Sequence, residues 1–252
     1  MTMDQQLINA CKTGDLETLT LKFLNHLESD IPVWHIHSWY EYSFNLACAY
    51  GHIHVVKFLL SLEEILGRLD IHADYEYSFR YGCQNGHLNI VQFLLTLEET
   101  HGHIDVHFWN DYAFHTACKN GHLTVAKFLL TLEKTRGCID IHMYGEYPFR
   151  YACAYGHMHV VKFLLLLEPD HGSIDIHAMD DYAFKFSKIH IRHRLVQQDP
   201  EYNWKQVEGY KNYFDEVNRI VEQLVQLHQK MIQLSTDILE LNVIQIVKDF
   251  LL

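Results

Sequence analysis

A recurrence of 35 residues constrains the fold of this chain more than any other feature. Gly-His pairs stand at 51–52, 86–87, 121–122 and 156–157. Columns of His, Tyr, Phe and Cys keep the same spacing: His37, His72, His107, His142 and His177; Tyr42, Tyr77, Tyr112, Tyr147 and Tyr182; Phe44, Phe79, Phe114, Phe149 and Phe184; Cys48, Cys83, Cys118 and Cys153. A period between about 20 and 50 residues indicates a solenoid, in which each unit buries its apolar face against its neighbours.

Each unit is predicted to be an extended finger followed by two helices. In the unit that begins at Ile104, residues 104–107 alternate apolar and polar, which is typical of an extended segment. A short amphipathic helix is indicated by apolar residues at i, i+3 and i+4: Phe114, Ala117 and Cys118. Gly121 can take the left-handed conformation that ends this helix. Residues 122–132 are apolar except for one narrow polar stripe and predict the second helix.

The unit resembles an ankyrin repeat, above all in the run ACKNGHLTVAKFLL at residues 117–130. The T-P-L-H signature is replaced by sequences such as Tyr-Ser-Phe-Arg, and only Pro148 and His115 keep its Pro and His. The period exceeds the usual ankyrin length of about 33 residues, and the excess lies in the loop after the second helix. The resemblance implies an all-α, ankyrin-type solenoid of helix-turn-helix repeats with short finger loops. The repeated I-D-I-H and E-Y-x-F sequences are also similar to ankyrin arrays of giant DNA viruses of amoebae, which implies a viral protein in the host cytoplasm.

Two regions are expected along the chain. Residues 1–194 form the repeat array, with a degenerate first repeat near 3–24 as an N-terminal cap, four full repeats and a C-terminal half repeat from 174. Terminal repeats are expected to be atypical because one of their faces meets water. Residues 195–252 form a helical C-terminal extension.

The extension has three competing interpretations. It can fold back as a helical cap on the last repeat. It can self-associate through a heptad-like apolar seam formed by Val207, Tyr210, Phe214, Val217, Val221 and Leu224. Residues 234–252 also loosely resemble the F-box-like helix pair of large-virus ankyrin proteins, which implies a ubiquitin-ligase substrate adaptor, although the usual Pro is missing.

Composition and motifs exclude several classes of function. The net charge of -12 falls on residues 1–184, and an acidic array repels phosphate backbones, so no nucleic-acid partner is expected. The first thirty residues contain no signal peptide or membrane span, so a cytoplasmic protein is expected. No phosphate-binding loop, catalytic carboxylate pair or nucleophile motif is present, so we expect neither an enzyme nor a cofactor.

The recurring Cys and His columns are expected to be structural. Buried free cysteine acts as a small hydrophobe. Helices of adjacent repeats lie about 10 Å apart, whereas zinc ligands lie about 2 Å from the ion, so one histidine per repeat closes no metal site. The acidic column Glu41, Glu76, Asp111, Glu146 and Asp181 is expected to face the positive end of each first helix.

Columns that vary between repeats are the candidates for binding a partner protein. By analogy with ankyrin arrays, the ends of the fingers and the first helices line one concave surface. Tyr, Trp and Arg, which dominate binding hot spots, are frequent there. The predicted partner-binding residues are Trp39, Tyr40, Asn45, Tyr50, Tyr75, Arg80, Tyr81, Phe108, Trp109, His115, Lys119, Tyr144, Arg150, Tyr151 and Tyr155.

Overall fold

The computed structural model describes residues 5–27, 33–167, 171–175, 178–180, 182–183 and 219. The chain divides into two compact units, Met1–His193 and Arg194–Leu252. The cap, seam and F-box-like interpretations of the extension concern residues outside the described part, and they stay predictions, as do the predicted domain boundaries.

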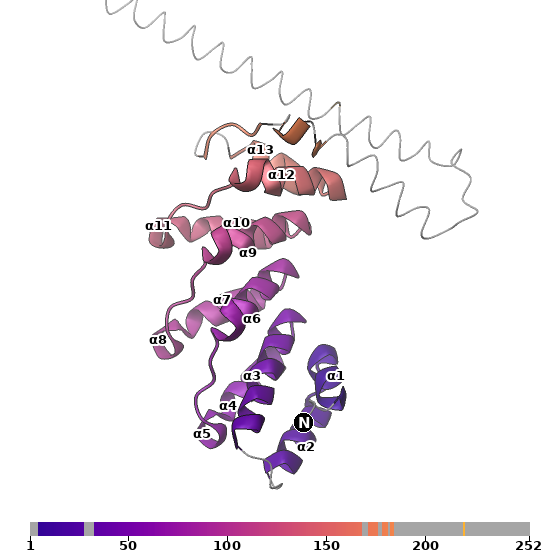
Figure 1. Ribbon diagram of the computed structural model, residues 1–252, viewed down its shortest axis with the longest axis vertical. Coiled ribbons are helices and arrows are strands. Elements are labelled where there is room, and N and C mark those ends of the chain that lie inside the picture. The colour runs from indigo at the N-terminus through magenta and orange to yellow at the C-terminus, as the bar shows by residue number, and fades with distance from the viewer. Residues whose placement is uncertain are drawn as a thin grey trace, which may run out of the picture. The chain divides into compact units, whose positions relative to one another are not determined.

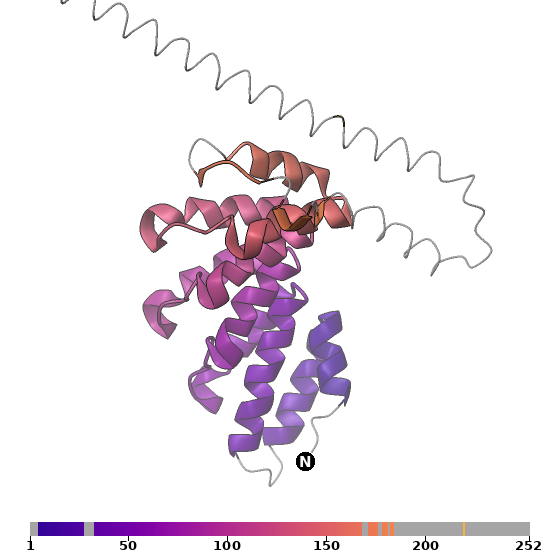
Figure 2. The same ribbon diagram turned by 45° about the horizontal axis from the view of Figure 1, so that its top comes forward.

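The described residues of the first unit form helices in a repeating order (Figures 1 and 2). The N-terminal part contains α1 (Gln5–Thr13), α2 (Leu16–Leu27), α3 (Val33–Ala49) and α4 (Ile53–Ser61). The later first helices are α6 (Ala73–Gln84), α9 (Phe108–Lys119) and α12 (Met143–Tyr155); the second helices are α7 (Leu88–Thr96), α10 (Leu123–Thr131) and α13 (Met158–Leu165). The loop that carries the extra residues of the long period forms short helices, α5 (Glu63–Leu66), α8 (Glu98–His101) and α11 (Glu133–Arg136). The predicted helix pairs are confirmed, and the described residues contain no strand.

The first helices pack on one another in chain order, α3 on α6, α6 on α9 and α9 on α12, and each also packs on its own second helix. The Phe column forms the centre of this packing, because all four of its described side chains are buried: Phe44, Phe79, Phe114 and Phe149. Truncating such a side chain to Ala costs about 3–5 kcal/mol. Cys48, Cys83 and Cys118 are buried free thiols beside this row, so the structural interpretation of the Cys column is confirmed there.

The Gly-His pairs join neighbouring repeats. Gly51 has φ 82°, and a Cβ there would meet Nδ1 of His87 at 2.5 Å. Gly86 stands in the same way against His122, and Gly121 against His157. Because the glycine of one repeat leaves room for the histidine ring of the next, both residues recur together.

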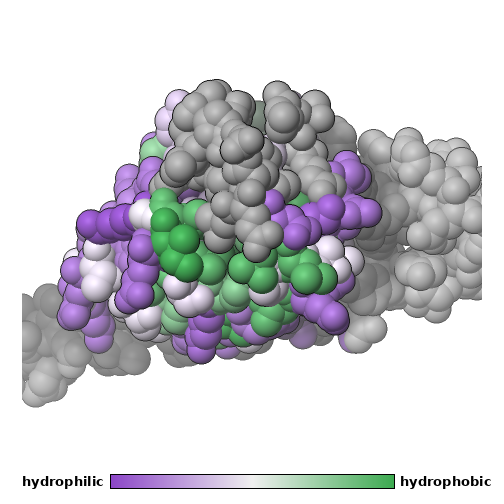
Figure 3. All heavy atoms as spheres, turned by 90° about the horizontal axis from the view of Figure 1, so that it is seen from below, coloured by the Kyte–Doolittle hydropathy of each residue, from purple (hydrophilic) through white to green (hydrophobic). Residues whose placement is uncertain are grey.

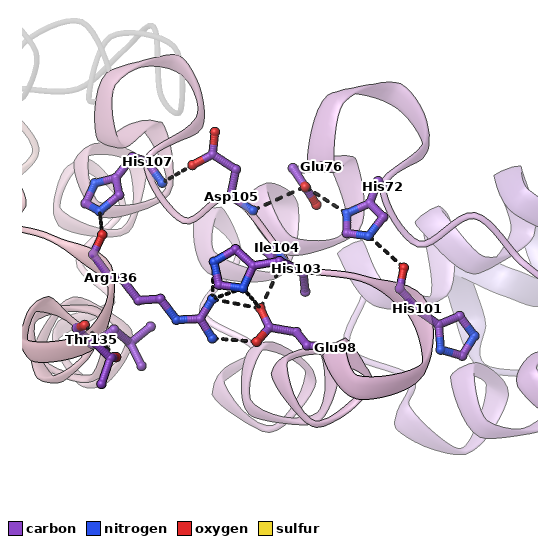
Figure 4. A network of polar contacts seen from close by, with 11 residues as sticks. His72, Glu76, Glu98, His101, His103, Ile104, Asp105, His107, Thr135 and Arg136 are labelled. Atoms are coloured by element: carbon purple, nitrogen blue, oxygen red, sulfur yellow. Dashed lines mark hydrogen bonds and ion pairs between the residues drawn. The ribbon is translucent and has the colours of Figure 1, made fainter.

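The fingers form a hydrogen-bonded ladder in which histidine connects successive loops (Figure 4). His72 places Nδ1 2.8 Å from Oε1 of Glu76, and its Nε2 lies 3.1 Å from the carbonyl oxygen of His101. Glu76 also accepts the backbone N–H of Asp105 in the next finger. His107 and His142 repeat these contacts with Asp111 and Glu146. The expected hydrogen-bonding role of the His column is therefore confirmed for these three residues.

The ladder explains the protonation of its histidines. Both ring nitrogens of His72, His107 and His142 face acceptors, which only the imidazolium can satisfy with two N–H groups. Burial acts to lower the pKa of each histidine, but the carboxylate and carbonyl partners outweigh burial and raise it. The fingers thus favour protonated histidine.

The N-terminal end carries exposed apolar side chains. Leu21 and Leu24 of α2 are about half exposed. Figure 3 views the molecule from the side on which α2 lies in Figure 1, and hydrophobic residues gather there among hydrophilic ones. The more polar face expected of an N-terminal cap is present on α1, whose Gln5 and Gln6 are exposed.

Candidate partner-binding surface

Each later first helix begins with a left-handed turn of three residues, which we call the tip. The tips are 74–76, 109–111 and 144–146, and every residue in them has φ between 53° and 63°. A left-handed residue other than glycine costs about 1–2 kcal/mol, and among the three tips only the middle residue Gly145 avoids that cost. The surrounding contacts must therefore hold the tips in place.

Two of the tips are each held by a buried arginine of the same helix. Nε of Arg80 donates to the carbonyl oxygen of Tyr75 at 2.6 Å, and its terminal nitrogen donates to that of Asp74 at 3.0 Å. Arg150 makes the same two bonds to Gly145 and Tyr144. Only 3% of Arg80 and 5% of Arg150 is exposed, so these two predicted partner-binding residues are buried and hold the tips instead of lying on an open surface.

The Arg80 guanidinium also lies among aromatic rings of the next repeat. Its central carbon is 4.2 Å from the ring centroid of Trp109 and 5.3 Å from that of Tyr112. Phe108 of the same next repeat lies at 5.8 Å, and Tyr81 of α6 itself lies at 5.7 Å. A cation within about 6 Å of a ring centroid is attracted by the ring quadrupole, so this side chain joins α6 to α9.

His115 takes the place of arginine in the repeat between Arg80 and Arg150. It is buried, and its Nε2 lies 3.2 Å from the carbonyl oxygen of Asp140. Burial lowers the pKa of His115, although Asp140 and Asp111 oppose that effect, so the ring is neutral near pH 7. Here the structure has a cavity of about 310 Å³, the α9–α12 cavity, lined by Trp109, Tyr112, His115, Thr116, Tyr144 and Tyr147.

The remaining predicted residues divide by exposure. Tyr75, Trp109 and Tyr144 at the tips are 68%, 54% and 59% exposed, and Tyr50 is also exposed. The half-buried ones are Tyr81, Phe108, Lys119, Tyr151 and Tyr155. The amino group of Lys119 lies 5.2 Å from the ring centroid of Tyr151 and 5.9 Å from that of Tyr155, so these three lie together beside the cavity residue Tyr147.

Three predicted residues of the first full repeat are buried, which corrects their assignment to an open surface. Trp39 and Tyr40 lie within α3, which continues as a helix through the positions where later repeats have a tip. The hydroxyl of Tyr40 donates to the carbonyl oxygen of Leu59 at 2.7 Å. Asn45 is buried and accepts the hydroxyl of Ser78 at 2.6 Å.

Sequence reasoning missed two groups of residues. Glu76, Asp111 and Glu146 are buried tip carboxylates that bind the finger ladder, not merely charges facing a helix end. Tyr112 and Tyr147 belong to a column that does not vary and so were not among the predicted binding residues, yet both line the cavity. The signal that could have identified them is their position three residues before the varying Arg80, His115 and Arg150 column.

One group of described residues has metal-ligand chemistry. Single ligand atoms of Glu133, Cys138 and His171 lie within 4.8 Å of one another. Zinc binds thiolate, imidazole and carboxylate, but burial and the charge of Glu133 raise the pKa of the Cys138 thiol, which opposes the thiolate form that a metal requires. The thiol instead faces Glu133 and His171 at hydrogen-bonding range, 3.7 and 3.9 Å.

Comparison with known proteins identifies the repeats. The sequence model described as "Ankyrin repeats (3 copies)" matches residues 79–180, which include α9, α10, α12 and α13. Over these residues the chain is similar to ankyrin repeats. With the all-helical described part, this match confirms the ankyrin-type solenoid expected from the sequence.

Among solved structures, the ankyrin array is similar to an ankyrin repeat family protein from Legionella pneumophila, with 21% identity and a TM-score of 0.41. The match covers 73% of this chain and 65% of that protein, which is less than two thirds of its length. No curated protein matches the chain, and the resemblance to giant-virus arrays stays a prediction. Ankyrin repeats generally mediate protein–protein interaction and are typically non-catalytic. In the described residues, no helix is long and apolar enough to cross a membrane.

Proposed function

We propose that this ankyrin array is a non-enzymatic scaffold that binds a partner protein across its tips and first helices. The observation that carries the proposal is the exposure of three large rings, Tyr75, Trp109 and Tyr144, at successive tips. Exposed aromatic groups of this size mark interaction sites when they lie together. The first two rings stack, with centroids 6.3 Å apart, and the third lies beside Asn110, which donates to its hydroxyl at 3.0 Å.

The tips suit recognition because they combine exposure with a fixed backbone. Arg80 and Arg150 bind tip carbonyls, and the finger histidines bind tip carboxylates. A side chain that is already positioned loses less conformational freedom on binding. Rigid rings on a fixed backbone are therefore a favourable surface for a protein partner.

Affinity capture tests the proposal with a variant in which Tyr75, Trp109 and Tyr144 are all changed to Ala. Captured proteins from the cells that express the chain are quantified by mass spectrometry beside the wild type. We expect at least a tenfold loss of the specific partner, since aromatic hot spots contribute about 2 kcal/mol or more each. Circular dichroism should show a helical content like that of the wild type, because the buried Phe column is unchanged, although thermal unfolding should report some loss of stability from the contacts of Tyr75 and Trp109.

The matched control changes exposed apolar residues away from the tips, Ile65 on α5 together with Leu21 and Leu24 on α2, to Ala. This control variant should capture the same partner as the wild type. If the tip variant also retains the partner, the tips are not the binding surface and the proposal fails.

The proposed partner is a protein of the host cell if the predicted viral origin is correct. The alternative function, a ubiquitin-ligase adaptor, depends on residues 234–252, which lie outside the described part of the chain. It stays a prediction that capture of cullin-complex components by the full chain would support.

A further inference from the structure

Successive interfaces between first helices use the same columns with different side chains. In the α6–α9 interface the columns hold Arg80 and Tyr81 on one side and Trp109 on the other. The residues 35 positions later, in the α9–α12 interface, are His115, Thr116 and Tyr144. All three side chains are smaller than their counterparts. The α9–α12 cavity therefore occupies space that the larger side chains fill one repeat earlier.

Arg150, at the position equivalent to Arg80 and His115, again has its guanidinium among tyrosine rings. Its guanidinium carbon lies 4.6 Å from the ring centroid of Tyr182 and 5.8 Å from that of Tyr151, which are the equivalents of Tyr112 and Tyr81. Arginine with a tyrosine beside it thus occurs on both sides of the His115 repeat. The chain itself shows which chemical group this arrangement of rings accepts.

We propose that the α9–α12 cavity binds an arginine side chain of the partner protein, whose guanidinium lies among Trp109, Tyr112, Tyr144 and Tyr147. The proposal rests on the proposed function, since it names the group that the tip surface recognises. Guanidinium is the suitable cation because it is planar, is weakly hydrated and stacks on aromatic faces.

Size and charge agree with this occupant. The cavity of about 310 Å³ is at the lower end of the range for ligand pockets, about 300–1,000 Å³, which suits one side chain better than a large ligand. The chain carries a net charge of -12, and Asp111 and Asp140 act electrostatically on His115 at the cavity wall. The cations nearest the cavity, Arg80 and Lys119, already interact with its rings. The attraction for a further guanidinium therefore comes from the rings themselves, and the neutral His115 does not repel it.

The test compares two probe peptides, acetyl-Gly-Arg-Gly-amide and the same peptide with citrulline, which has nearly the shape of arginine without its charge. The full chain is titrated with each peptide, and the indole N–H signal of Trp109 is followed by NMR after assignment with Trp109→Phe. We expect saturable shifts with the arginine peptide and at least tenfold weaker binding of the citrulline peptide. Equal binding of the two peptides would overturn the proposal.

His115→Arg supplies the matched protein variant, because it places the chain's own guanidinium where Arg80 and Arg150 have theirs. We expect it to fold, to melt at a higher temperature than the wild type, and to lose arginine-peptide binding at least tenfold. If this variant fails to fold, Tyr144→Ala is the second test, since it removes one exposed cavity ring and should weaken binding severalfold. Undiminished binding in the folded variant overturns the proposal.

The two proposals fail in distinguishable ways. If the partner is lost from the triple tip variant but still captured by folded His115→Arg, the tips bind a partner without an arginine in the cavity. The arginine proposal then fails and the proposed function stands. If the triple tip variant keeps the partner, the proposed function itself fails.

Discussion

The α6–α9 and α9–α12 interfaces are built from the same columns, and they differ in what lies between the helices. Arg80 fills the first interface and binds the carbonyls of its own tip, whereas His115 leaves a cavity in the second. The two first helices pack on each other in both interfaces, α6 on α9 and α9 on α12. The difference shows that the repeat tolerates loss of the internal cation at one position, and that a cavity lies where the other interface has a structural contact.

The largest expected effect comes from making the first interface resemble the second with Arg80→His and Tyr81→Thr together. This change removes two hydrogen bonds from a buried guanidinium, its ring contacts and the stacking of Tyr81 on Tyr77 at 4.0 Å. We expect the free energy of unfolding to fall by about 3 kcal/mol. Urea denaturation followed by circular dichroism measures it. Peptide titration should then report a second arginine-binding site.

The control for this change is Arg68→His, which alters an arginine that is exposed on the loop after α5. A surface substitution of this kind changes stability by no more than about 0.5 kcal/mol. If the double variant is as stable as this control, Arg80 does not hold the α6 tip. The difference between the two interfaces would then not contribute to the free energy of unfolding.

Much of the array could be predicted from the sequence, because the 35-residue period, the Phe column and the Gly-His pairs are local patterns with one packing solution. The buried role of Arg80 and Arg150 could not. Their contacts require left-handed tips. Gly145 and Asn110 are residue types that adopt this conformation, but Tyr75 and Trp109 are not, so the sequence does not show that the three tips share it. The variation between Arg80, His115 and Arg150 was therefore interpreted as specificity of an exposed surface, although all three side chains are buried.

The first repeat shows a second reason for incomplete prediction. Trp39 and Tyr40 align with tip residues, but α3 continues through them as one helix and buries both rings. A helix of 17 residues satisfies its backbone hydrogen bonds without the finger ladder. Alignment by period assigns residues to columns, and it does not determine whether the backbone at a column is a helix or a left-handed turn.

An intermediate effect is expected from exchanging the middle residues of two tips. Gly145→Tyr places a tyrosine at φ 63°, where Tyr75 already lies with the same φ. Tyr75 offsets its conformational cost by stacking on Phe108 and Trp109, with centroids 6.0 and 6.3 Å apart. Residue 145 faces Met179 instead, so its substitution should cost about 1 kcal/mol in unfolding free energy.

The reciprocal change, Tyr75→Gly, provides the control for this exchange. It relieves left-handed strain and loses ring stacking, so the two effects nearly cancel, and stability should change by less than about 0.5 kcal/mol. Thermal unfolding of both variants measures the pair. If Tyr75→Gly stabilised the protein by as much as Gly145→Tyr destabilises it, stacking at the α6 tip would contribute nothing to stability.

The smallest expected effect is a pH dependence of the free energy of unfolding. It arises because His115 titrates near neutral pH, whereas Arg80 at the equivalent position is always charged. Burial lowers the pKa of His115 below its ordinary value of 6.5, so the unfolded chain takes up a proton at this residue before the folded chain does. The stability that neutral His115 contributes is present above pH 6.5 and is lost as the pH falls through the lowered folded pKa.

His115→Gln removes this titration and keeps a donor for the carbonyl of Asp140. The difference in unfolding free energy between wild type and variant should therefore shift in favour of the variant as the pH falls from 7 towards 5. His107→Gln provides the opposite sign, because the folded pKa of His107 is raised, and its contribution is full below pH 6.5 and lost as the pH rises through that raised value. Urea denaturation at several pH values measures both. A His115 difference that does not vary with pH would mean that burial does not lower the pKa of His115 in the folded chain.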